Sequence, residues 1–152
     1  MILLRRSTPR ILLIALVVFV FDQASKAIVV ARMRPGEETE LFSFLSLERT
    51  SNTGVAFGLA SGVPPVVLVL LASAIVLLLL ILGSRLRWRG SSVAIGLVLG
   101  GALGNLADRV FRGHVVDFIA VPHWPTFNLA DAAITVGVLL LLIGSLRSGG
   151  GR

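Results

Sequence analysis

Apolar residues fall into four long runs along the chain, and most polar residues lie in the segments between them. The runs cover residues 11–31, 63–83, 92–111 and 127–146. Each has the length of about 20 residues that a helix needs to cross the roughly 30 Å hydrocarbon core of a bilayer. The pattern predicts an all-α integral membrane protein, with four transmembrane helices in a single membrane domain over residues 1–152.

The longest segment between two runs, residues 32–62, differs in character from the runs themselves. It begins with the turn sequence Pro35-Gly36, and residues 41–47 are rich in phenylalanine, leucine and serine. Such a stretch is typical of short strands. We expect a small β-sheet in this outer loop, lying on the membrane surface with Phe42 and Phe44 turned toward the lipid or the spans. A loop without regular structure is the alternative.

The composition agrees with lipid as the natural solvent. Hydrophobic residues make up 55% of the chain and charged residues 14%, whereas a soluble domain carries about 25% charged residues. The chain has no cysteine, which excludes a disulfide framework, a zinc–thiolate site and a cysteine nucleophile.

The basic residues indicate how the four helices are oriented. Residues 1–10, 84–91 and 147–152 flank the runs on one side, with eight arginines and no acid; the rest of the chain holds the other six basic residues and all eight acids. The positive-inside rule then places both termini and the 84–91 loop in the cytoplasm, as four spans require. The net charge of +6 follows from this topology, so we expect no nucleic-acid partner. The eight arginines are Arg5, Arg6, Arg10, Arg85, Arg87, Arg89, Arg147 and Arg152.

The N-terminus also resembles a secretory signal, because arginines precede an apolar stretch at 11–21 and the small residues Ser25 and Ala27 follow it. Apolar residues resume at 28–31, and we therefore expect an uncleaved spanning helix. The third run carries Gly96, Gly100 and Gly104 at four-residue spacing, which is typical of close helix packing in lipid.

Several ionisable residues lie inside the predicted spans, all in the outer half of the membrane or at its boundary. A charge at the centre of a spanning helix costs about 2.5–3.5 kcal/mol on insertion scales, so such residues are functional candidates. Their gathering in one layer predicts a functional site near the outer face. They are Asp22, Lys26, Asp108, Arg109 and Asp131, with Asp117 just outside a span.

Structural explanations exist for several of these residues. Asp22 and Lys26 lie four residues apart on one helical face, where an ion pair alone would make the first span tolerable in lipid. Arg109 beside Asp108 is open to interpretation as a snorkelling arginine with its counter-ion, although we favour substrate contact for Arg109 and for Asn105 on the same helix. Asn128 and Asp131 would also suit the start of a helix, as a cap and a first-turn acid.

Asp117 and Asp131 have the strongest claim to chemistry. Asp117 lies within an apolar run. An acid in an exposed loop would normally have polar neighbours, so this placement indicates a functional role. Pro122 and Pro125 between the two acids exclude one continuous helix, so the chain must turn back and both acids can reach one depth. Two carboxylates in a poorly solvated site cannot easily both ionise. One would stay protonated while the other accepts a proton from water, as in aspartic proteases.

Five sequence blocks, in order, resemble the signature of the lipoprotein signal peptidase (signal peptidase II) family. The resemblance extends over residues 11–146, and each block alone is weak evidence. In many members a serine follows the second aspartate, where this chain has Ala132; the difference affects only a secondary hydrogen bond. The blocks are Asp22-Gln-Ala-Ser-Lys26, Asn52-Thr-Gly-Val-Ala-Phe-Gly58, Gly104-Asn-Leu-Ala-Asp-Arg109, Val115-Val-Asp-Phe118 and Phe127-Asn-Leu-Ala-Asp131.

The resemblance implies an aspartic endopeptidase with Asp117 and Asp131 as its catalytic pair and no metal or other cofactor. It implies cleavage of prolipoproteins just before their diacylglyceryl-modified cysteine, and a sheet from residues 32–62. We expect a monomer that contacts lipid and lipidated substrates. Supporting residues around the substrate and the pair would be Asp22, Lys26, Asn52, Gly54, Asn105, Asp108, Arg109 and Asn128.

Two other functions suit some of the same residues. A small transporter or proton-relay subunit would also carry intramembrane Asp, Lys and Arg, but it favours charges spread through the whole depth, and here the inner halves of the runs are bare. A serine–lysine protease would use Ser25 and Lys26. Adjacent helical residues point about 100° apart, so these two side chains cannot face each other directly.

Overall fold

A computed structural model describes residues 4–53, 67 and 90–149 of the chain. Three long helices and four strands make up these residues. In chain order the elements are α1 (Leu4–Arg32), β1 (Glu38–Phe42), β2 (Leu45–Asn52), α3 (Ser91–Arg112), β3 (Val115–Val121), β4 (Trp124–Phe127) and α4 (Leu129–Gly149). The predicted second span at 63–83 lies outside the described residues, apart from position 67.

The helices agree with three of the predicted spans to within a few residues, except at the N-terminus, where α1 begins seven residues before the apolar run. Thr8–Arg32 and Ser91–Arg112 are long and apolar enough to cross a membrane, whereas the apolar part of α4, Leu129–Gly144, is shorter. The structure therefore supports two spanning helices and a third apolar helix among the residues that it describes.

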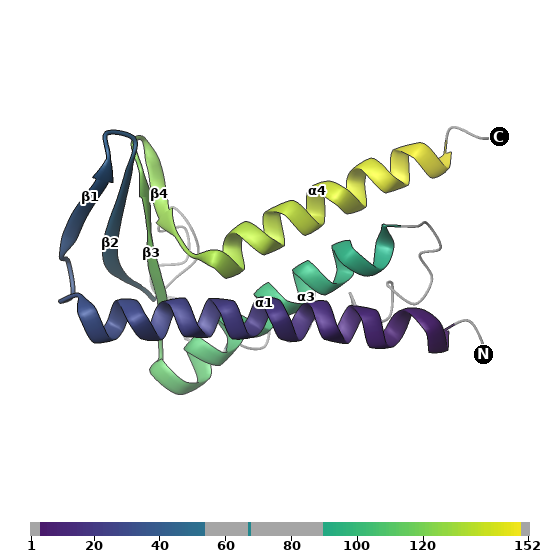
Figure 1. Ribbon diagram of the computed structural model, residues 1–152, viewed down its shortest axis with the longest axis horizontal. Coiled ribbons are helices and arrows are strands. Elements are labelled where there is room, and N and C mark those ends of the chain that lie inside the picture. The colour runs from purple at the N-terminus through teal and green to yellow at the C-terminus, as the bar shows by residue number, and fades with distance from the viewer. Residues whose placement is uncertain (1–3, 54–66, 68–89, 150–152) are drawn as a thin grey trace.

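Helix α3 lies between α1 and α4 and packs along both (Figure 1). Glycines allow this close approach, as the four-residue spacing predicted. A Cβ atom on Gly100 would lie 2.6 Å from the carbonyl oxygen of Ala15 on α1, and one on Gly137 of α4 would lie 2.5 Å from a methyl group of Val98 on α3. Real side chains do not approach so closely, so a larger residue would push the helices apart.

The four strands form one antiparallel sheet in the order β1-β2-β3-β4. The sequence predicted the first two strands in the outer loop but not the second two, which come from the connection between α3 and α4. This corrects the expectation of a sheet built from residues 32–62 alone. The two prolines suit the hairpin that forms instead: Pro122 lies in its turn, beside His123 at φ 63°, and Pro125 lies on the edge strand β4, where the sheet loses no internal hydrogen bond to it.

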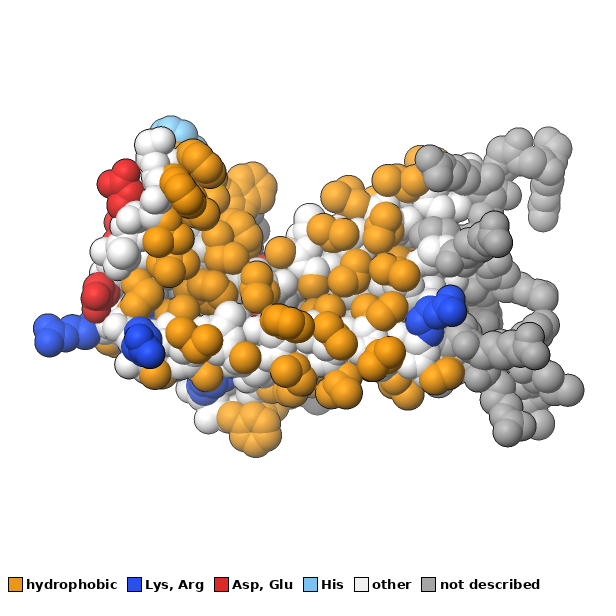
Figure 2. All heavy atoms as spheres, in the orientation of Figure 1, with side chains coloured by type: hydrophobic (Ala, Val, Ile, Leu, Met, Phe, Trp, Pro, Cys, Tyr) orange, Lys and Arg blue, Asp and Glu red, His pale blue; other side chains and the backbone are white. Residues whose placement is uncertain are grey.

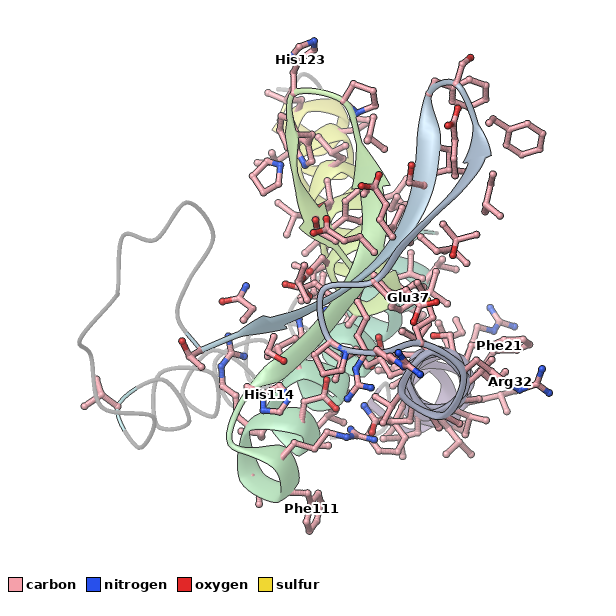
Figure 3. All side chains as sticks on the ribbon, turned by 90° about the vertical axis from the view of Figure 1, so that its left-hand side faces the viewer. Phe21, Arg32, Glu37, Phe111, His114 and His123 are labelled. Carbon is pink, nitrogen blue, oxygen red and sulfur yellow. The ribbon has the colours of Figure 1, made fainter. Side chains whose placement is uncertain are left out.

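The sheet stands across the end of the helices where α1 ends and α4 begins (Figure 1). Seen from that side, the turn at His123 lies far from Arg32, the last residue of α1, and from Glu37, which immediately precedes β1 (Figure 3). A small core joins sheet to helix at the base: Val116 and Phe118 of β3 are buried against Val29 of α1. Burying a side chain of this size contributes about 1.5–3 kcal/mol, so β3 is held firmly at the C-terminal end of α1.

Large apolar side chains cover much of the face shown in Figure 2. On α1, Leu13 and Phe21 are 61% and 66% exposed, and on α4 Leu146 is 78% exposed. An apolar surface of this extent is unfavourable in water and suits helices that face lipid. At the sheet, Phe42 and Phe44 stack with ring centroids 5.7 Å apart and are also exposed, so they do not pack against the described spans.

Candidate active site

Polar and charged side chains converge where α1, α3, β3 and the first turn of α4 meet. Those that are almost completely buried lie on α1, α3 and β3 and at Asn128, which immediately precedes α4. Of the site residues predicted from the sequence, only Gly54 falls outside the described residues. The buried members are Asp22, Lys26, Asn105, Asp108, Asp117 and Asn128, while Asn52, Arg109 and Asp131 are partly exposed.

Asp117 points from β3 toward two amide donors. The Asn128 side-chain amide donates to Oδ1 at 2.6 Å, and the Asn52 amide donates to Oδ2 at 3.0 Å. The pKa of Asp117 is raised to about 6, chiefly by burial and also by the charge of Asp131, while the hydrogen bonds from Asn52 and Asn128 partly oppose the rise. A carboxyl with this pKa can exchange a proton near neutral pH, as general acid–base catalysis requires.

Asp131 belongs to the first turn of α4 and is held there from two sides. Asn128 caps the helix: its Oδ1 accepts from the backbone N–H of Asp131 at 2.9 Å, and Oδ2 of Asp131 accepts from the backbone N–H of Asn128 at 3.3 Å. This reciprocal pair has the form of a capping box. The other carboxylate oxygen, Oδ1, accepts from the Asn105 amide at 2.7 Å. The helix-start explanation for Asp131 is therefore correct, but it accounts for only one of the two oxygens.

Asn128 links the two acids directly. Its side chain is fully buried, with its oxygen on the backbone of Asp131 and its nitrogen on Asp117. The same nitrogen also lies 3.2 Å from Oδ1 of Asn105. A short amide network thus fixes the orientation of both carboxylates relative to each other.

Beneath the acids lies a buried ionic cluster centred on Lys26. Its Nζ is 2.8 Å from Oδ2 of Asp22 and 2.9 Å from Oδ2 of Asp108, and all three side chains are fully buried. The sequence predicted the Asp22–Lys26 pair but not the participation of Asp108. Removing one partner of a buried pair leaves an uncompensated charge and costs about 3–5 kcal/mol.

Two residues of this cluster were not identified from the sequence. Gln23 donates from Nε2 to Oδ2 of Asp22 and to the carbonyl oxygen of Gly104, both at 3.1 Å. Arg112 forms an ion pair with Asp108 and donates to Oε1 of Gln23 at 3.2 Å. The four-residue spacing from Asp108 to Arg112 was the available signal. Together these two side chains cover the ionic cluster at the C-terminal end of α3.

Arg109 lies at the edge of the same region and is partly exposed. Its Nη1 donates to the backbone carbonyl of Asn105 at 3.4 Å, and the charges of Asp131, Asp117 and Asp108 act on its guanidinium. It is therefore held beside the two acids by its own helix, with part of its surface open.

The serine–lysine alternative does not fit the geometry. The Ser25 hydroxyl donates to the backbone carbonyl of Asp22 at 2.8 Å, while the Lys26 ammonium is directed at Asp22, Asp108 and Asn105. A lysine whose donors are all taken by buried acceptors cannot serve as the base for a serine nucleophile.

Comparison with known proteins gives one consistent result. A family model for signal peptidase (SPase) II matches residues 14–147. A lipoprotein signal peptidase from Rhodococcus jostii (strain RHA1) is 41% identical over 140 residues, covering 88% of this chain and 70% of that protein. One from Chlorobium phaeobacteroides (strain BS1) is 38% identical over 146 residues, covering 86% and 92%. A bacterial membrane enzyme solved at 1.9 Å resolution is similar at a TM-score of 0.79 and 35% identity, covering 90% of this chain and 92% of that one.

Proposed function

The chain belongs to the signal peptidase II family, and from this premise we propose that Asp117 and Asp131 are the carboxylates with which it cleaves its substrate. It is an aspartic-type peptidase of the bacterial membrane that removes signal peptides from prolipoproteins. The observation that carries the assignment of the two residues is their shared amide network, in which Asn128 contacts both.

The proposed reaction uses the two carboxylates in opposite protonation states. The ionised one takes a proton from a water molecule, whose oxygen attacks the carbonyl carbon of the scissile peptide bond. The protonated one donates its proton to the carbonyl oxygen, which gives a tetrahedral gem-diol. The carboxyl that took the proton from water then donates it to the leaving nitrogen, while the other carboxylate takes a proton back from a hydroxyl of the gem-diol. The carbon–nitrogen bond breaks, so the signal peptide gains a carboxylate and the lipoprotein a free amine. The apparent pKa values of the site then belong to the pair of carboxyls and not to either residue alone.

The substrate that we propose is a precursor carrying a diacylglyceryl-modified cysteine, cut just before that residue. Arg109 is partly exposed beside both acids, and its fork of donors suits a peptide carbonyl or a lipid phosphate. Asn52 reaches Asp117 from the end of β2, so that strand would help to shape the same site. We propose a monomer that acts on substrates embedded in lipid, with no cofactor.

Purified protein incubated with a lipidated and an unlipidated form of the same precursor tests this function. We expect mass spectrometry to show a new N-terminus at the modified cysteine in the first reaction, and no cleavage in the second. Equal cleavage of both forms would show that the protein does not recognise the lipid. Cleavage at other positions would contradict the assigned bond.

We further propose four spans with both termini in the cytoplasm. The charge split of the flanking segments supports this orientation, as does the placement of the start of α1 and the end of α4 at the same end of the molecule (Figure 1). The sheet and both acids would then lie at the outer face, with Phe42 and Phe44 in contact with lipid. Within the described residues, buried acids and lysine are confined to this one layer, which does not favour a proton path across the membrane.

Reporter domains fused after Gly36 and after Gly90 should therefore report opposite sides of the membrane. A periplasm-dependent reporter should be active at the first position and inactive at the second. Identical behaviour at the two positions would show that the topology is wrong.

A further inference from the structure

Lys26 occupies an unusual position, because each of its three donors has its own buried acceptor. Its Nζ lies 2.8 Å from Oδ2 of Asp22, 2.9 Å from Oδ2 of Asp108 and 3.0 Å from Oδ1 of Asn105. An ammonium group has three hydrogens and no acceptor. The three contacts therefore use its whole capacity, and the fully buried side chain has no remaining donor for water or substrate.

Two of these acceptors, the carboxylates of Asp22 and Asp108, also accept hydrogen bonds from backbone N–H groups next to the proposed catalytic acids. Oδ1 of Asp22 accepts from the backbone N–H of Ala130 at 3.0 Å, and Ala130 immediately precedes Asp131. Oδ2 of Asp108 accepts from the backbone N–H of Val116 at 3.2 Å, and Val116 immediately precedes Asp117. One carboxylate thus fixes the start of α4, the other fixes β3, and Lys26 ties the two carboxylates together.

The third acceptor acts through side chains. Because Oδ1 of Asn105 faces Lys26, its amide nitrogen must face the other way, where it donates to Asp131 at 2.7 Å. The reverse orientation would set two donors against each other at Lys26 and two acceptors at Asp131. Asn105 Oδ1 also accepts from the Asn128 amide, which donates to Asp117. The orientation of one amide therefore reaches both acids.

We propose that Lys26 is a positioning residue that sets the separation and the orientation of the two catalytic carboxylates, through Asp22, Asp108 and Asn105. This inference rests on the proposed function of Asp117 and Asp131. It also gives a role to the tetrapeptide Asn-Leu-Ala-Asp, which occurs at residues 105–108 and 128–131. The first copy supplies two of the three acceptors of Lys26, and the second supplies Asn128 and Asp131, which the first copy orients.

A buried ion pair that only stabilises the fold would share most of these contacts, so the test must separate stability from positioning. The double variant Lys26→Met/Asp22→Asn removes one positive and one negative charge together. The amide oxygen that it introduces can still accept from the backbone N–H of Ala130, and Asp108 keeps its ion pair with Arg112. Lys26→Arg keeps the charge, but a planar fork cannot direct three hydrogens at acceptors arranged around one ammonium nitrogen.

The measurements are kcat and KM for a lipidated precursor, together with the inhibition constant of a precursor analogue in which a hydroxyl-bearing carbon replaces the scissile carbonyl. Thermal unfolding in the same detergent reports how much of each variant is folded. Arg32→Gln is the matched control, because it removes an exposed cation from the last turn of the same helix and leaves Asp22, Asp108 and Asn105 unchanged. It should change kcat little.

For both Lys26 variants we expect folded protein in which kcat falls by about 100-fold, as a misplacement of about 1 Å produces in a reacting pair. KM should change little, and the inhibition constant of the analogue should rise in step with the loss of kcat/KM. Either variant retaining kcat while folded would overturn the proposal, and so would a failure of both to fold, since Lys26 would then act on folding alone.

If Asp117→Asn or Asp131→Asn proves active, the proposed function itself fails; if both are inactive but the Lys26 variants keep their kcat, only the positioning role fails.

Discussion

Asp117→Asn is expected to abolish cleavage of the lipidated precursor while leaving the protein folded. An asparagine has nearly the same shape but can neither take a proton from water nor give one to the leaving amine. We expect the rate to fall by about 10⁴-fold, the upper end of what general acid–base catalysis contributes. The folded state should lose little, because the hydrogen bond that the amide loses to Asn52 or Asn128 is offset by removal of a buried charge.

The double variant Asp117→Asn/Asp131→Asn should be hardly slower than either single variant, because members of one catalytic unit are not additive. Glu40→Gln is the matched control: it exchanges an exposed carboxylate of β1 in the same sheet and should cut at the parent rate. The measurement is turnover of a lipidated precursor by each purified protein. Losses that multiply in the double variant would show that the two acids act independently.

Substitution of Asn128 should separate its two roles. Asn128→Ser keeps a good helix cap, but the shorter side chain has no amide to reach Asp117 and Asn105. We expect nearly parental stability and a rate about 100-fold lower, since the carboxylates lose the group that orients them. Asn128→Ala loses the cap as well and should cost about 1 kcal/mol in addition.

Turnover and thermal unfolding on the same two variants provide the test. If Asn128 only capped α4, activity would follow stability, and the serine variant would cut at the parent rate. A fully active Asn128→Ser protein would therefore contradict the role of this side chain in orienting the acids.

Helices α1 and α3 could be predicted from the sequence because a helix that crosses a bilayer needs about 20 apolar residues, and such a run is easily recognised. Both helices are long and apolar enough to cross a membrane, and they lie close to the predicted ranges. The glycine spacing on α3 was equally informative, since close packing of helices requires small residues at a fixed interval.

Strands β3 and β4 could not be predicted in the same way. Their pairing depends on residues distant in sequence: Asn52 of β2 lies opposite Val115 of β3. The apolar run around Asp117 was visible, but no local pattern shows which strand it will join. The two prolines predict a turn, which the structure confirms, but they do not indicate that the turn belongs to a hairpin of the same sheet.

Contacts between elements of the site were also difficult to predict from the sequence. The sequence placed Asp117 and Asp131 at one depth, and the structure adds that Asn128 contacts both. Periodicity along one helix identified the Asp22–Lys26 pair, but the contact of Lys26 with Asn105 crosses from α1 to α3. Such a contact depends on how two helices are rotated against each other, which single-helix periodicity does not determine.

Asp131 allows the most direct test, because the capping box gives it a structural role that competes with the catalytic one. The decisive measurement is the turnover of a lipidated precursor by purified Asp131→Asn, with its thermal stability recorded in the same detergent. We predict a folded protein, less stable by about 1 kcal/mol through the loss of one hydrogen bond, that does not cut. A destabilised Asp131→Asn protein that still cuts at the parent rate would leave Asp131 as a helix cap and contradict the proposed mechanism.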